Sequence, residues 1–178
     1  MSAKPRDPLL ASARIIVCIL IGVMIFAMVM VGIGTGALLT VKRADILAEA
    51  VKVSAPDTAY WLVVVAMLFI EGLLYLALQF FTELNRIIGS VGEGEAFNPV
   101  NAQRLSRMGW FVVGAQGLGL VLGSIAAYLA PYAEKAGHDT HLGFGLDGGG
   151  ILTALLLFIL ARVFREGARM RADLEGTV

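Results

Sequence analysis

A glutamate inside an otherwise apolar segment is the strongest candidate for chemistry in this sequence. Glu71 is the one charged residue within 59–81. Ionisable side chains are costly in hydrocarbon unless they are paired, so an intramembrane acid is by default a candidate functional residue. Gln116 lies at a similar depth in another apolar segment. Measured from the end of each segment that we predict below to face the cytoplasm, Gln116 lies about 12 Å and Glu71 about 15 Å into the membrane. Together they form a candidate intramembrane polar site, either a hydrogen bond between helices or a proton or ligand site.

The sequence offers little else that could catalyse a reaction or hold a metal. His138, Asp139 and His141 are close together and are of types that bind zinc, but their glycine-rich surroundings lack a fourth ligand and the helical spacing of known sites. No Ser-His-Asp set, paired carboxylates or Cys-His cluster occurs in the sequence. We therefore predict no metal, no cofactor and no enzymatic activity.

The composition indicates a chain whose solvent is lipid. Of its 178 residues, 58% are hydrophobic and 16% are charged, whereas soluble domains have roughly a quarter charged residues. The 14 basic and 14 acidic side chains balance, which argues against direct binding of nucleic acid. The single cysteine, Cys18, excludes a disulfide within the chain.

Four apolar runs are candidates for membrane spans, each of which needs roughly 20 residues. The first is too long for the apolar core of a signal peptide, so we expect it to be retained. Pro131 is expected to help end the third. We predict an all-α polytopic membrane protein with a single domain, residues 1–178. Its four transmembrane helices should cover residues 15–41, 59–81, 108–131 and 148–164.

The distribution of basic residues predicts the orientation. With both termini on one side of the membrane, the other side holds only Lys42, Arg43, Lys52 and Lys135 out of 14 basic residues. Because basic residues are concentrated on the cytoplasmic side, both termini should be cytoplasmic and the protein should lie in the cell inner membrane. On the outer side, residues 44–53 are expected to form a short amphipathic helix.

The stretch GEGEAFNPVNAQRL (92–105) then lies in the single cytoplasmic loop between spans. Asn98-Pro99 is typical of a helix start, with Asn98 as the cap and Pro99 at the first helical position. The preceding helix should continue past the bilayer until Gly89 and Gly92, and the last helix should continue through Arg171. Three helical segments would then project into the cytoplasm.

These projections could form a docking surface for a soluble partner, or they could be solvated basic ends that topology alone explains. Both interpretations remain open. The candidate docking residues are Glu95, Phe97, Asn98, Asn101, Arg104, Phe164, Arg165 and Glu166.

Small residues at four-residue spacing indicate close helix packing. Ala115, Gly119, Gly123 and Ala127 would share one helix face. The sequence leaves open whether this face meets a neighbour within the chain or a second copy, so a homo-oligomer is possible.

Several of these residues also carry a family resemblance. They are Gly94-Glu95-Ala96-Phe97, then Asn98, Asn101, Arg104 and Leu105, the helix start at Gly109-Trp110, Val163-Phe164-Arg165-Glu166-Gly167, and Gly176-Thr177-Val178. With these features the chain resembles the bacterial membrane-protein family called domain of unknown function 2975. The resemblance implies four spans, and a small helix-turn-helix regulator encoded beside many members as a cytoplasmic partner.

Two functional hypotheses follow. In the first, the protein is a regulatory interaction protein that docks or sequesters such a regulator. In the second, it is a small oligomeric transporter or channel with Glu71 and Gln116 along the path.

Overall fold

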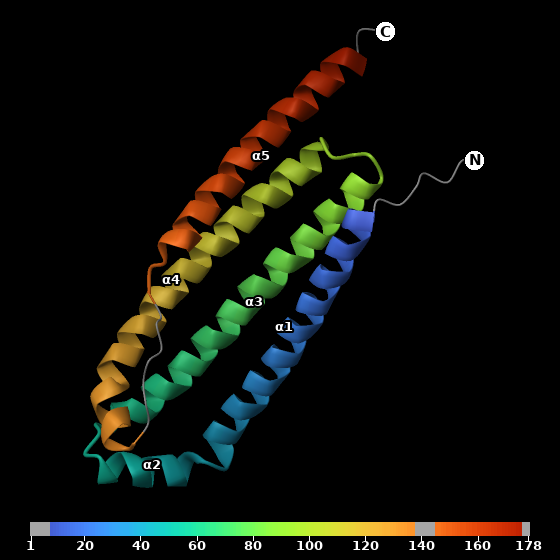
Figure 1. Cartoon of the computed structure of the whole chain (residues 1–178). Helices are drawn as coiled ribbons and strands as arrows, with labels where there is room; N and C mark the ends of the chain where they lie inside the picture. The colour runs from blue at the N-terminus through green and yellow to red at the C-terminus, as the bar shows by residue number, and fades with distance from the viewer. Residues whose placement is uncertain (1–7, 138–144, 176–178) are drawn as a thin grey trace.

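The computed structural model describes residues 8–137 and 145–175, and this part of the chain is almost entirely helical (Figure 1). The all-α prediction is therefore confirmed. The helices are α1 (Pro8–Thr40), α2 (Arg43–Lys52), α3 (Thr58–Gly92), α4 (Pro99–Lys135) and α5 (Gly148–Glu175).

Within the described ranges, four helices are long and apolar enough to cross a membrane, namely α1, α3, α4 and α5. They contain 33, 35, 37 and 28 residues. At 1.5 Å per residue their lengths are about 42 to 55 Å, longer than the roughly 30 Å of a hydrocarbon core. Each helix therefore has several turns to spare outside a bilayer.

The four long helices lie side by side in an open row, in the order α1, α3, α4, α5, and neighbours in the row run in opposite directions (Figure 1). The start of α1, the end of α5 and the α3–α4 connection lie at one end of the row, which we call the loop end. The short α2 lies across the opposite end, which we call the α2 end. This α2 is the amphipathic helix predicted at 44–53.

Large apolar side chains point outward along much of the row. Phe26, Ile33, Leu68 and Ile159 each expose half or more of their surface. Such exposure would be unfavourable in water and is suited to contact with lipid chains.

The main buried core lies towards the loop end, where α3, α4 and α5 meet. It consists of Ile87, Leu105, Met108, Leu157 and Ala161. Partly buried aromatic residues, including Phe80 and Phe164, pack around it. This core fixes the ends of the three helices relative to one another, and so positions the polar residues described below.

The helix boundaries at the α3–α4 connection match the sequence prediction. The N–H of Val100 donates a hydrogen bond of 3.0 Å to Asn98 Oδ1, so Asn98 caps α4 as expected. At the α2 end the prediction for Pro131 was wrong, because α4 continues through Pro131 to Lys135. A proline removes one hydrogen bond inside a helix, but the following residues still find carbonyl partners one turn back.

Candidate functional site at the loop end

A buried carboxylate at the loop end is surrounded by three guanidinium groups. Glu83 on α3 is 6% exposed. Its Oε1 lies 3.2 Å from Arg86 Nη1 and 3.5 Å from Arg107 Nη1, and its Oε2 lies 3.7 Å from Arg104 Nε. Because Arg104 and Arg107 come from α4, this carboxylate joins the two helices electrostatically. We call these four residues the Glu83 cluster.

A fully buried amide holds the connection between α3 and α4. Asn101 has 0% exposure. Its Nδ2 donates to Ser90 Oγ at 2.7 Å and to the carbonyls of Ala96 at 3.0 Å and Glu95 at 3.3 Å. Its Oδ1 accepts a hydrogen bond of 3.0 Å from Arg104 Nη1. Asn101 therefore ties the connection to both helices and to the Glu83 cluster through Arg104.

The connection presents an aromatic side chain to α5. The Phe97 and Phe164 ring centroids lie 5.2 Å apart, while Phe97 still exposes 46% of its surface. A Cβ atom added to Gly167 would lie 2.6 Å from the Phe97 ring, so only glycine leaves room for this contact. Beside Phe97, Asn98 Nδ2 donates to Glu95 Oε2 at 3.3 Å.

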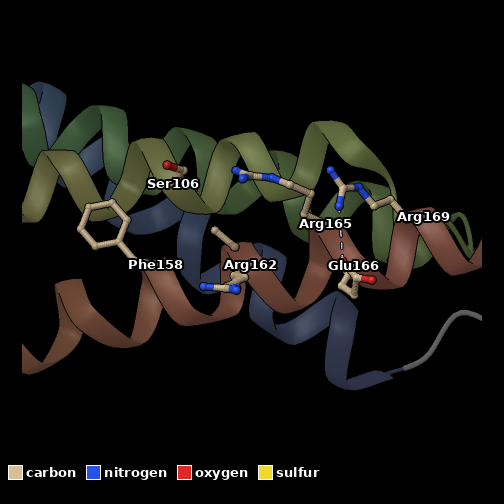
Figure 2. A pocket seen from close by; sticks show the side chains of 7 residues that line it. Ser106, Phe158, Arg162, Arg165, Glu166 and Arg169 are labelled. Carbon is tan, nitrogen blue, oxygen red and sulfur yellow. Dashed lines mark ion pairs between the residues drawn. The ribbon is translucent and has the colours of Figure 1, made fainter.

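A pocket between α4 and α5, which we call the α4–α5 pocket, lies on the other side of this contact. Its volume is about 450 Å³. It is lined by Ser106, Phe158, Ala161, Arg162, Arg165, Glu166 and Arg169 (Figure 2). Arg165 follows Phe164 in sequence and therefore projects about 100° further round α5.

The candidate docking residues thus fall into three groups. Glu95, Phe97, Asn98 and Phe164 lie at the α3–α4 connection and its contact with α5. Arg165 and Glu166 line the α4–α5 pocket. Asn101 and Arg104 belong to the internal hydrogen-bond network.

No pattern in the sequence alone assigns Glu83, Arg86 or Arg107 to a site. Glu83 and Arg86 are spaced i, i+3, which is also typical of an exposed helix face.

The two residues of the candidate intramembrane site contact different neighbours. Gln116 Oε1 accepts a hydrogen bond of 3.0 Å from the N–H of Asp147, and its amide nitrogen lies against Gly150 of α5. Glu71 Oε1 faces Gly32 of α1, and its Oε2 is buried without a hydrogen-bond partner among the described residues. Of the two alternatives for this site, the hydrogen bond between Glu71 and Gln116 is not formed.

The possible metal ligands His138, Asp139 and His141 lie outside the described residues. Across 8–137 and 145–175, no three His, Cys, Asp or Glu side chains are grouped closely enough to hold a metal ion.

Comparison with known proteins gives one family match. The family described as "Protein of unknown function (DUF2975)" matches residues 46–178. No curated protein and no solved structure matches the chain.

Proposed function

Because the chain belongs to the DUF2975 family, we propose that it is an integral protein of the cell inner membrane that docks a small cytoplasmic helix-turn-helix regulator at its loop end. Docking would hold the regulator at the membrane and away from DNA. In this proposal the protein itself neither binds nucleic acid nor catalyses a reaction.

The observation that carries the proposal is the exposed aromatic ring of Phe97 on a fixed backbone. About half of this ring is accessible, and the Asn101 hydrogen bonds hold the carbonyls just before it. Aromatic anchors that need no ordering on binding are typical energetic centres of protein interfaces. The exposed Glu95 beside it supplies the polar rim that such interfaces have.

The range of the family match supports the same region. Residues 46–178 include α3, α4 and α5, whose ends build the loop end, and leave out α1. Release of the regulator would require a signal that favours one packing of these helices over another, since only differential affinity shifts such an equilibrium.

Replacing Phe97 by Ala is expected to weaken regulator binding by about 30-fold, the typical cost of removing a central aromatic anchor. The measurement is a titration of the detergent-solubilised full chain with a purified small helix-turn-helix regulator from the same organism.

The matched control is Trp61→Ala, which removes an aromatic side chain of similar exposure, 56%, near the α2 end. Binding by this variant should equal that of the wild type. The proposal fails if the wild-type chain does not bind the regulator, or if Phe97→Ala binds it as tightly as the wild type.

A transport function is the second candidate, favoured by the Oε2 atom of Glu71, which has no hydrogen-bond partner within 8–137 and 145–175. If Glu71 carries a proton or cation, Glu71→Gln should abolish a pH-dependent flux through the protein in liposomes, because the amide does not ionise. Adding Gln79→Glu to the Glu71→Gln variant restores the number of acidic residues in α3, but at another position. This second change should not rescue the flux. A wild-type chain without any flux would remove this candidate.

A further inference from the structure

The α4–α5 pocket carries positive charge that the described part of the chain does not neutralise. Three arginines line it, and Glu166 offsets one of them through an ion pair of 3.6 Å with Arg169. Neither Arg162 nor Arg165 has an ion pair or hydrogen bond with another described residue. In Figure 2 the Arg165 and Arg169 side chains reach from α5 towards α4. The pocket therefore presents two unpaired guanidinium groups to whatever occupies it.

The arginines of the neighbouring Glu83 cluster differ from those of the pocket in their contacts. There, Arg86, Arg104 and Arg107 all lie within 4 Å of one buried carboxylate, at 3.2, 3.7 and 3.5 Å. Both places hold three arginines and one glutamate, but all three arginines contact the carboxylate between α3 and α4, whereas only Arg169 does so between α4 and α5. The exposed guanidinium groups of Arg162 and Arg165 are therefore available to an external anion.

The surroundings of the pocket indicate which kind of anion fits. The pocket follows α5 for about 16 Å, from Phe158 to Arg169. One end is therefore formed by an aromatic ring and the other by charged groups. On the same helix, Leu155 and Ile159 expose 54% and 50% of their surfaces, which is suited to contact with acyl chains. An occupant with an anionic head and an apolar body matches both ends, whereas a free phosphate ion matches only the charged end.

We propose that the α4–α5 pocket binds the phosphate group of an anionic phospholipid. Arg162 and Arg165 supply charge-assisted hydrogen bonds to the phosphate oxygens, and the Ser106 hydroxyl on α4 supplies a further donor. The acyl chains run past Phe158 along the apolar surface of α5. Basic pockets between membrane helices are suited to such headgroups. This site goes beyond the proposed docking function, because it lies on a different side of α5 from Phe97.

A tryptophan beside the pocket provides the test. The Trp110 and Phe158 ring centroids lie 5.6 Å apart, and Trp61→Phe leaves Trp110 as the single tryptophan of the two in the chain. This variant is reconstituted in bilayers of dibrominated phosphatidylcholine, which quenches tryptophan fluorescence. Unbrominated phosphatidylglycerol or phosphatidylcholine is then added, and the fluorescence returns as the unbrominated lipid replaces the brominated lipid beside Trp110. Phosphatidylglycerol should restore the fluorescence at an about 30-fold lower fraction, the preference expected for two basic contacts of about 1 kcal/mol each.

Variants in the same background separate a shaped site from general attraction to basic residues. Arg162→Gln with Arg165→Gln should abolish the preference for phosphatidylglycerol, and Ser106→Leu, which fills the pocket at constant charge, should also reduce it. Arg86→Gln with Arg107→Gln removes the same charge from the Glu83 cluster and should leave the preference intact.

Three results with the lipids and variants would overturn the proposal, and a fourth comes from competition with phosphate. The first is equal recovery of fluorescence with both lipids. The second is a preference for phosphatidylglycerol that persists after Arg162 and Arg165 are replaced. The third is an equal loss of this preference in the control variant with Arg86→Gln and Arg107→Gln. Inorganic phosphate at millimolar concentration should not reduce the preference. If it does, the pocket is a site for free phosphate and the assignment to a lipid is wrong.

Discussion

An Asn101→Ala variant is expected to lose about 3 kcal/mol of stability at the loop end, because the change creates a cavity and leaves buried polar groups without partners. The carbonyls of Glu95 and Ala96 lose their donor, and Arg104 loses an acceptor. Amide hydrogen exchange in the α3–α4 connection should accelerate on the order of 100-fold, which corresponds to that free energy. The measurement is hydrogen exchange of the detergent-solubilised chain.

Asn98→Ala is the matched control for this variant. It removes the same side chain three residues away, but Asn98 makes only the cap hydrogen bond to Val100 and the contact with Glu95. Loss of a helix cap costs about 1 kcal/mol, so exchange should accelerate only about fivefold. Equal acceleration in the two variants would contradict the structural role of Asn101.

The two variants also test whether docking depends on preorganisation. In Asn101→Ala the Phe97 ring is still present, but its backbone must be ordered on binding. Regulator affinity should therefore fall although no surface residue has changed.

The helices, and their ends at the α3–α4 connection, could be predicted from local sequence. Hydropathy identified the four spans, and Asn98-Pro99 located the start of α4 because a cap depends only on neighbouring residues. The extension of α3 to Gly92 was likewise indicated by its glycines. The α5 helix continues to Glu175, beyond the predicted Arg171.

The polar residues of the site could not be assigned in this way, because their roles depend on which way each helix faces. Depth along two helices placed Glu71 and Gln116 at the same level, but depth does not fix rotation about the helix axis. In the structure Glu71 faces α1 and Gln116 faces the start of α5. A pairing based on depth alone therefore failed.

Burial of a charged residue is equally a property of packing. Glu83 and Glu166 each precede an arginine by three residues, at Arg86 and Arg169. The local sequence pattern is the same at both places. The side chain of Glu83 is 8% exposed because α4 packs over it, whereas that of Glu166 is 64% exposed. Only the contact between α3 and α4 distinguishes the two pairs.

Replacing Glu83 by Ala should consequently destabilise the chain by about 3 kcal/mol, the lower end of the range for breaking a buried ion pair. The lower end applies because Arg86 and Arg107 have side chains 56% and 62% exposed and can be solvated after the change. Arg104, 23% exposed, keeps its hydrogen bonds to Asn101 and to the carbonyl of Arg86. The measurement is reversible unfolding in mixed micelles with increasing sodium dodecyl sulfate.

Glu166→Ala provides the comparison, since it removes the same side chain from the same i, i+3 pattern. An exposed ion pair contributes little, so this variant should stay within about 0.5 kcal/mol of the wild type. Glu83→Gln keeps the size of the side chain but removes the charge that three arginines share, and it should recover only part of the loss. If Glu83→Gln were as stable as the wild type, hydrogen bonding and packing rather than charge would join α3 to α4. The contrast between arginines that contact a carboxylate and arginines that do not would then lose its physical basis.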